Sequence, residues 1–503
     1  MSEKLSKAGD QLRWIALPGA PILAAFAYFT LGPTGLEHEP RAVAAVALWM
    51  AMWWMTEAVP LAATSLLPLV LFPVLQVTTM AAASSPYAHP LVGLFFGGFV
   101  LGMGVEKWGL HRRLALATVL IVGTQPTRLI AGFMIATAVL SMFISNTATA
   151  LMMLPIAVSV IGLLERMGLS KANFGPALLL AIAFSSSIGG VATVTGTQPN
   201  IITVALLRER GIEISWGQWL PLGLTLFAIM MPLTWFILTR VTLPVKVKEI
   251  PGVQELLRTE YKSLGGMSRG EWTIIIVFAM VAAGWIFRGA TAKWLEANGF
   301  PAFAESLNTL GDAGIAMLGA IVLFAIPVNV EKREFAMDWA SAVKMPWDVL
   351  LLFGGGLSLA AAMGSSGLDV YIGDKMGGLA GLPTWAIILI VTLGVVFLTE
   401  LTSNTATTAA LVPVLGSAAE GMGIHPVLLM VPAGIVASYA FMLPVATPPN
   451  AIIFSSGRVK ITQMAWSGLI LSTAGAVVIT LVVSMFGGTL LQLDLGVDPA
   501  TGG

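Results

Sequence analysis

The chain has 503 residues, of which 10% are charged and 57% hydrophobic, and its mean hydropathy is +0.88. Soluble proteins carry about 25% charged residues, so this composition predicts an all-α polytopic membrane protein. The 26 basic and 26 acidic residues balance, which gives no reason to expect nucleic acid as a partner, and the lack of cysteine excludes disulfides, thiolate metal sites and cysteine nucleophiles.

Apolar runs long enough to cross a bilayer recur from one end of the chain to the other. The polar N-terminus leads into an apolar run with no A-x-A cleavage site, so a retained first helix is expected rather than a signal peptide. Eleven spans are expected, at about 14–32, 42–60, 61–79, 90–108, 174–206, 216–239, 272–288, 312–329, 347–364, 428–456 and 463–490.

Two further apolar blocks, about 127–165 and 384–420, each contain the motif Ser-Asn-Thr-Ala-Thr (SNTAT) near the middle. Each block is too long for one span and too polar at its centre to face lipid, where an unpartnered polar group costs several kcal/mol. Two half-length arms that meet at a polar tip fit better. The sequence therefore predicts two re-entrant helical hairpins besides the eleven spans.

Three short motifs recur in the same order in both halves of the chain. The SNTAT motif recurs at an offset of 258 residues, "LFFGGF" (94–99) resembles "LLFGGG" (351–356), and "GTQPN" (196–200) resembles "ATPPN" (446–450). Gly97 and Gly354 fall on spans expected to run in opposite directions, so the repeats are expected to be inverted. Inverted repeats with interrupted helices are typical of secondary transporters.

The distribution of Lys and Arg predicts the orientation of the chain. Counting spans, and letting each hairpin enter and leave on one side, places most basic loops on the side of the N-terminus. The positive-inside rule then puts the N-terminus in the cytoplasm and the C-terminus outside. We expect a multi-pass protein of the cell inner (plasma) membrane.

The two hairpin tips carry groups that suit a cation and an anion together. Each Ser-Asn-Thr triplet (145–147 and 403–405) supplies hydroxyl and amide groups that donate and accept. A tip also frees backbone carbonyls, which suit Na⁺, and a helix N-terminus, which suits an anion. One isolated triplet would more simply cap the second arm. Two copies in inverted repeats favour a binding function.

A second polar break follows each hairpin. Gly196 and Pro199 in the first half, and Pro448 and Pro449 in the second, interrupt a span and expose carbonyls, although a simple proline kink is the plainer explanation for one Pro. The expected midplane lacks Arg and Lys, which are costly in lipid. A bound anion would therefore be neutralised by bound cations, which is a physical reason for coupling.

Other classes of function find less support. No His lies near the tips, so a membrane-embedded enzyme lacks a nucleophile–base pair or metal cluster, and no organic cofactor is expected. Two occluding tips fit alternating access better than a channel. Glu57 and Glu400 lie near span ends, where each is either a proton carrier or a hydrogen-bonded carboxylate.

The chain resembles the divalent anion/sodium symporters, the family of sodium-coupled di- and tricarboxylate transporters. The matching words are "WWMTEAVPLAATSLLPL" (53–69), both SNT motifs, "GTQPN" and "FMLPVATPPNAIIF" (441–454). The resemblance implies an elevator mechanism, in which a homodimeric scaffold stays still while a hairpin-bearing transport domain slides. It implies scaffold helices at 1–125 and 246–380, the latter with a cytoplasmic loop, and transport-domain parts at 126–245 and 381–503.

The resemblance also implies the binding residues. It places a first Na⁺ site at Ser141, Ser145, Asn146 and Gly196, a second at Thr399, Thr402, Asn404, Ala446 and Pro448, and the substrate at Asn146, Thr147, Asn404, Thr405 and Thr447. Two positions depart from the family pattern. Gln198 stands where a second proline is common, and Thr402 stands where a relative can carry alanine.

The leading interpretation is Na⁺-coupled symport of a small C4-dicarboxylate anion such as succinate, malate or fumarate. A Na⁺-independent dicarboxylate exchanger, or citrate or sulfate as the cargo, remains the alternative. The hydroxyls at Ser141 and Thr399 favour cation binding, because an exchanger has no need of them.

Overall fold

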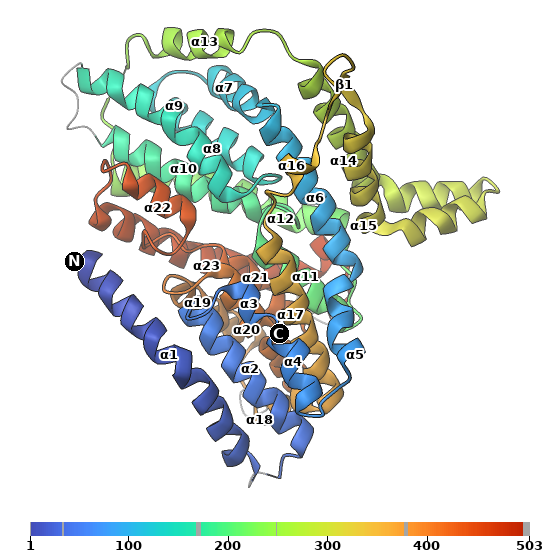
Figure 1. Ribbon diagram of the computed structural model, residues 1–503. Helices are drawn as coiled ribbons and strands as arrows, with labels where there is room; N and C mark the ends of the chain where they lie inside the picture. Colours follow the sequence, from blue (N-terminus) through green and yellow to red (C-terminus); the bar gives the residue numbers. More distant parts are fainter. Residues whose placement is uncertain (1, 33–34, 167–172, 248, 377–380, 496–503) are drawn as a thin grey trace.

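The computed structural model describes residues 2–32, 35–166, 173–247, 249–376 and 381–495, drawn in colour in Figure 1. The expected domain ranges extend over the gaps. The C-terminus that we expect outside the cell, residues 496–503, lies beyond the described residues, as do Lys171 and Lys248 of the basic loops.

The described chain is almost entirely helical, as the composition predicts. The first half contains α1 Ser2–Thr30, α2 His38–Thr56, α3 Leu61–Thr64, α4 Leu67–Val74, α5 Met80–Ser84, the 3-10 helix η2 Ser85–Ala88, α6 Pro90–Lys107, α7 Leu110–Val122, α8 Pro126–Ser141, α9 Asn146–Arg166, α10 Phe174–Val191, α11 Gln198–Glu209, α12 Trp216–Phe236 and the π-helix η3 Ile237–Thr242.

The second half contains α13 Val253–Ser263, α14 Arg269–Ala297, α15 Pro301–Ala325, α16 Trp339–Ala342, α17 Trp347–Ser366, α18 Leu368–Met376, α19 Thr384–Thr399, α20 Asn404–Gly421, α21 Val427–Ala437, α22 Pro448–Ser455 and α23 Ile461–Leu491. Two short antiparallel strands, β1 Pro327–Asn329 and β2 Glu334–Phe335, follow α15. Among the described residues, nine helices are long and apolar enough to cross a membrane.

The expected span at 61–79 is not one helix. It divides into α3 and α4, which are too short to cross a bilayer, and α4 ends at Val74. Pro68 at the start of α4 lacks an N–H for the helical ladder. Helix α17 packs closely at the division, because a side chain at Gly355 would collide with Ser65.

The paired spans α14 and α15 extend further than the hydropathy indicates. Both run beyond the expected apolar limits, and their far ends project from the rest of the molecule in Figure 1. Gly311 bends α15 within its length, with a φ of 62° that favours glycine. Asp312 holds the bend through Arg288, at 2.9 Å, and through the backbone N–H of Trp216 at the start of α12.

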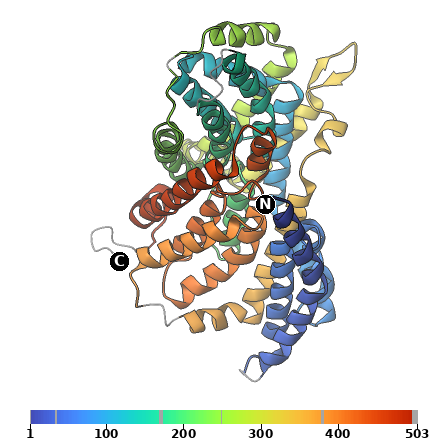
Figure 2. The same cartoon turned by 90° about the vertical axis from the view of Figure 1, so that its left-hand side faces the viewer.

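The interior brings the two repeats against each other. Hairpin α8–α9 packs on α10, and hairpin α19–α20 packs on α21. Each interrupted helix also reaches the opposite repeat, because α11 contacts α20 and α22 contacts α9. The red and orange helices of the second repeat accordingly lie beside the green helices of the first in Figure 2. The N-terminal pair α1 and α2 runs along one edge of the molecule.

Candidate functional site

The first hairpin tip is folded around one short hydrogen bond. Ser141, the last residue of α8, donates its hydroxyl to Oδ1 of Asn146, the first residue of α9, at 2.5 Å. Ser145 caps α9 by accepting the N–H of Ala148 at 3.2 Å. The Ser145 side chain therefore serves the helix end, which is the plainer of the two roles that the sequence left open.

The second tip repeats this arrangement at the same offset. Thr399, the last residue of α19, donates to Oδ1 of Asn404, the first residue of α20, at 2.7 Å, and its hydroxyl also lies 3.0 Å from the carbonyl oxygen of Ala437. Thr402 instead contacts the Leu398 carbonyl at 2.9 Å and the Thr407 hydroxyl at 2.6 Å. Since its side chain is engaged within the hairpin, the backbone of Thr402 is the part left to a ligand.

Each interrupted helix is held open by one buried asparagine. The amide of Asn200 donates to the carbonyls of Val191 and Thr193, at 3.0 and 2.8 Å. The amide of Asn450 donates to the carbonyls of Ala440 and Leu443, both at 3.0 Å. Buried carbonyls need such donors where the helical ladder stops. The inverted duplication thus extends to matching hydrogen bonds.

The residues before these asparagines also match. Thr197 and Thr447 precede α11 and α22 with nearly the same backbone angles, φ −142° and ψ 145° against φ −141° and ψ 149°. Thr447 caps its helix by accepting the N–H of Asn450 at 3.2 Å. Thr197 instead lies 3.3 Å from the hydroxyl of Ser438, in the opposite repeat.

The first tip and the first break meet at a cluster of oxygens. A Cβ added at Gly190 would lie 2.8 Å from Oδ1 of Asn146 and 3.1 Å from the Gly196 carbonyl oxygen. The Thr193 hydroxyl donates to the Met142 carbonyl at 2.6 Å and ties the two segments together. Of the predicted first cation site, Ser141, Asn146 and Gly196 therefore converge. Gly190 and Thr193 were missed, although the Gly-Gly pair at 189–190 marks this close approach.

The second tip is joined to the first break across the repeats. Thr405 donates its hydroxyl to Oε1 of Gln198 at 2.5 Å. Gln198 thus occupies the candidate site, at the position where the second repeat has Pro448. Its departure from the family pattern adds a side-chain amide beside the expected substrate residues.

Exposure separates the predicted site residues into three groups, and Thr402 belongs to the half-buried one. Ser141, Thr399, Thr405, Gly196, Ala446 and Thr447 are buried, whereas Asn146, Thr147 and Asn404 are half-buried, and Ser145 and Pro448 are exposed. The asparagine at each tip therefore contacts a buried hydroxyl on one side and is itself partly exposed to solvent. The donors are hydroxyl, amide and carbonyl oxygens, which are hard ligands of the kind that a small cation such as Na⁺ takes.

Glu400 follows Thr399 in the second tip. Its side chain is 2% exposed and accepts the N–H groups of Met442 and Leu443 at 2.9–3.0 Å. Of the two roles that the sequence left open, the structure shows a hydrogen-bonded carboxylate. Glu57, by contrast, is half-exposed and forms an ion pair with Arg13 at 3.1 Å.

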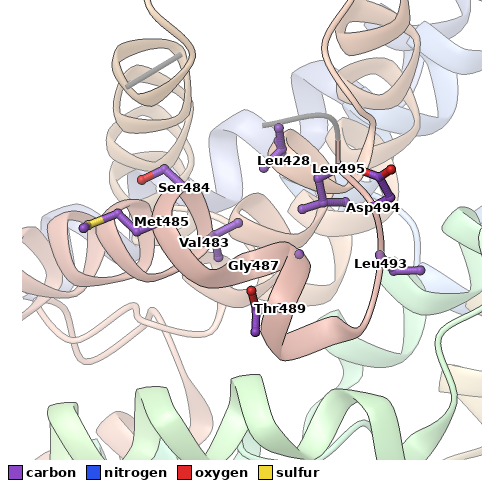
Figure 3. A pocket seen from close by; sticks show the side chains of 10 residues that line it. Leu428, Val483, Ser484, Met485, Gly487, Thr489, Leu493, Asp494 and Leu495 are labelled. Carbon is purple, nitrogen blue, oxygen red and sulfur yellow. The ribbon is translucent and has the colours of Figure 1, made fainter. Parts of the chain in front are cut away.

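A separate cavity of about 130 Å³ lies beside the end of α23 (Figure 3). Val483 and Thr489 of α23 line it together with Leu495 of the following segment. None of the predicted site residues belongs to its lining. This cavity therefore adds nothing to the site at the hairpin tips.

Comparisons with known proteins cover almost the whole chain. A family model described as the sodium:sulfate symporter transmembrane region matches residues 15–493. The sodium-dependent dicarboxylate transporter SdcS of Staphylococcus saprophyticus is 38% identical over 505 residues, with 98% of this chain and 95% of the relative covered. The protein of the same name from Staphylococcus aureus is 39% identical over 495 residues, with 96% and 92% covered.

A solved structure also shares the fold. The crystal structure of the Alcanivorax borkumensis YdaH transporter, described as having an unusual topology, matches with a TM-score of 0.58. The match covers 90% of this chain and 100% of that chain at 15% sequence identity. At this identity the likeness concerns the fold alone.

Proposed function

The chain belongs to the sodium:sulfate symporter family, whose members are transporters and not enzymes, and we propose that it carries C4-dicarboxylates such as succinate, malate or fumarate into the cell together with Na⁺. The observation that carries the proposal is the duplicated hydroxyl–asparagine contact, Ser141–Asn146 and Thr399–Asn404. The names of the relatives, sodium-dependent dicarboxylate transporters, support both the coupling ion and the class of cargo.

In this proposal each tip holds one Na⁺. The first ion is bound by the oxygens of Ser141, Ser145, Asn146 and Gly196, and the second by those of Thr399, Thr402, Asn404, Ala446 and Pro448. The convergence of Asn146 with Gly196 and the contact of Thr399 with the Ala437 carbonyl support these assignments. The backbone oxygens of Ser145 and Thr402 are the expected ligands, because their side chains have partners within the hairpins.

The dicarboxylate lies between the tips in this proposal. Its carboxylates meet the side chains of Asn146, Thr147, Asn404, Thr405 and Thr447. Helices α9 and α20 begin at the two asparagines, so their N-terminal N–H groups favour negative charge there. Without the two cations, a doubly charged anion would remain under-compensated, and this difference couples its transport to Na⁺.

We further propose that the protein works as a homodimer by an elevator motion. Residues 126–245 and 381–503 form the moving part, and residues 1–125 and 246–380 form the scaffold. The contacts of α11 with α20 and of α22 with α9 support this division, because they link the two hairpins and the two interrupted helices into one body. The N-terminus is cytoplasmic and the C-terminus external in this arrangement.

The proposed function is tested in liposomes that contain the purified protein. Uptake of radiolabelled succinate is followed under an inward Na⁺ gradient, with K⁺ or choline replacing Na⁺ in the control. We expect uptake only with Na⁺. Uptake that ignores Na⁺ but needs internal dicarboxylate would identify an exchanger instead. Competition by unlabelled citrate or sulfate then ranks the alternative cargoes.

Two variants connect the activity to the tips. Asn146→Ala and Asn404→Ala each remove an oxygen that the neighbouring hydroxyl contacts, and we expect either change to abolish Na⁺-driven uptake while the protein still purifies as a folded dimer. Asn308→Ala, at an exposed position of α15, is the matched control and should transport normally. Wild-type rates in either tip variant would contradict the site assignment.

A further inference from the structure

Two ion pairs join the opposite repeats at helix ends far from the hairpin tips. Arg210, which directly follows α11, lies 2.6 Å from a carboxylate oxygen of Glu420, near the end of α20. Arg458, shortly after α22, donates to both carboxylate oxygens of Glu165, near the end of α9, at 3.1 and 3.2 Å. Each of these inter-repeat ion pairs therefore connects an interrupted helix of one repeat to the second hairpin arm of the other.

The Arg210 guanidinium lies along the side of α20. Besides the ion pair, it donates to the Pro413 carbonyl at 3.1 Å and to the Ser417 hydroxyl at 3.0 Å. A Cβ added at Gly416 would lie 2.6 Å from Nε of Arg210, so a side chain there would displace the guanidinium. The Arg210 side chain is 16% exposed, whereas that of Arg458 is 34% exposed. Arg210 therefore makes the stronger of the two connections, because burial and additional acceptors strengthen an ion pair.

The Arg210 pair complements the contact near the tips. Thr405 and Gln198 join the beginnings of α20 and α11, and Arg210 and Glu420 join their ends. Helix α11 has 12 residues, which at about 1.5 Å per residue separates the two contacts by about 18 Å. The opposite charges of an ion pair largely cancel at that distance. The pair therefore acts on the site by holding the helices together rather than through its field.

The two inter-repeat ion pairs are not copies of one another. At the offset of 250 residues between the two breaks (450 − 200), Arg458 corresponds to Arg208 and not to Arg210. Arg208 pairs with Glu213 at 3.3 Å, within the first repeat. The connection between the repeats is thus made twice from positions that do not match, so the duplication alone does not explain it.

The proposed ligands divide between the repeats in a way that makes these connections matter. All ligands of the first proposed Na⁺ site lie in the first repeat, and all those of the second lie in the second repeat. The proposed contacts to the dicarboxylate come from both. A connection between the repeats therefore fixes the separation between the two groups of substrate contacts, while each cation site is complete within its own repeat.

We propose that the Arg210–Glu420 and Arg458–Glu165 pairs set the affinity for the dicarboxylate, by holding the two halves of its site at a fixed separation, and do not set the affinity for Na⁺. The inference rests on the proposed function. Both arginines are positioning residues, since neither belongs to the proposed ligands. When a pair is lost, the free site spends only part of its time at the separation that binds, and the apparent affinity falls by that fraction.

Two measurements on each variant separate the two affinities. Initial-rate uptake into liposomes at saturating Na⁺ gives the half-saturating succinate concentration. The melting temperature of the purified full-length protein without succinate, followed as Na⁺ replaces choline at constant ionic strength, gives the half-saturating Na⁺ concentration. We expect Arg210→Gln to raise the succinate value by about fivefold or more and to leave the Na⁺ value within about twofold of the wild type.

The more exposed pair offers a rescue experiment. Arg458→Gln should raise the succinate value by about two- to fivefold, because exposed ion pairs contribute less. The exchange of Glu165→Arg with Arg458→Glu restores an ion pair of reversed polarity, and its succinate value should lie closer to that of the wild type than in either single variant. Arg208→Gln is the matched control. It removes an ion pair within the first repeat and should keep both wild-type values.

Unchanged succinate values in both Arg210→Gln and Arg458→Gln would overturn the inference. An equal rise of the succinate and Na⁺ values would also overturn it, because it would indicate a general loss of structure. If Arg210→Gln does not fold, Arg458→Gln and the exchange still decide, since both side chains of that pair are partly exposed. A wild type without a Na⁺ response, or without Na⁺-dependent succinate uptake, would instead refute the proposed function itself.

Discussion

Thr399→Val is the sharpest single test of cation binding at the second tip. The Thr399 hydroxyl is fully buried and has one hydrogen for two acceptors, Asn404 Oδ1 at 2.7 Å and the Ala437 carbonyl at 3.0 Å. Its lone pairs therefore stay available to a cation. Valine keeps the branched shape and removes the oxygen. Such a change deletes one neutral ligand and leaves an acceptor without its donor.

The size of the effect follows from these contacts. Loss of one buried polar partner costs about 1–3 kcal/mol, and about 1.4 kcal/mol corresponds to a tenfold change in affinity. We therefore expect Thr399→Val to raise the half-saturating Na⁺ concentration for succinate uptake by between about fivefold and about 100-fold. Thr399→Ser keeps the hydroxyl and should stay within about threefold of the wild type.

The assay is initial-rate uptake into liposomes over a range of external Na⁺, at saturating succinate. Gel filtration of each variant before reconstitution shows that it is folded. If Thr399→Val kept the wild-type Na⁺ dependence, the hydroxyl would be structural, and its assignment as a ligand of the second Na⁺ site would be refuted. The serine variant keeps the hydroxyl and loses only the methyl group, so it controls for a change of side-chain shape at this position.

Two further predictions concern the breaks and the contact between the repeats. Asn200→Ala and Asn450→Ala each leave two carbonyls of an unwound segment without donors, so both should lose about 2–4 kcal/mol of stability. If thermal unfolding showed a loss of stability in only one of these two variants, the breaks would not be equivalent. Gln198→Ala and Thr405→Val remove the same hydrogen bond. Each should raise the half-saturating succinate concentration by about three- to tenfold. The double variant should show no larger increase than either single variant, because additive effects would mean that the two residues do not act through their shared hydrogen bond.

The hairpins and breaks could be predicted because their motifs occur in both halves of the sequence. A repeated polar motif inside an apolar block is compatible with few structures in a membrane. The observed tips begin their second arms at Asn146 and Asn404, within the predicted triplets. The family resemblance drawn from these words is confirmed by the match over residues 15–493. The residue-level binding roles stay predictions.

Other features depend on tertiary contacts, which the pattern of residues along the sequence does not reveal. Hydropathy indicates one span at 61–79, but the chain divides before Pro68, at the point where Gly355 of α17 approaches Ser65. The contact between Thr405 and Gln198 joins residues 207 positions apart and forms only when the two repeats pack. The sequence left the role of the Ser145 side chain open, because local caps and ligand sites use the same residue types.

The asparagine amides in the two breaks have a consequence for how the molecule moves. Each amide fastens two carbonyls that lie seven to ten residues before it. While these hydrogen bonds hold, the unwound segment can neither rewind into a helix nor extend, so it keeps one fixed conformation. In the proposed elevator motion, the binding groups would therefore move as one preassembled unit, without winding or unwinding of the two breaks.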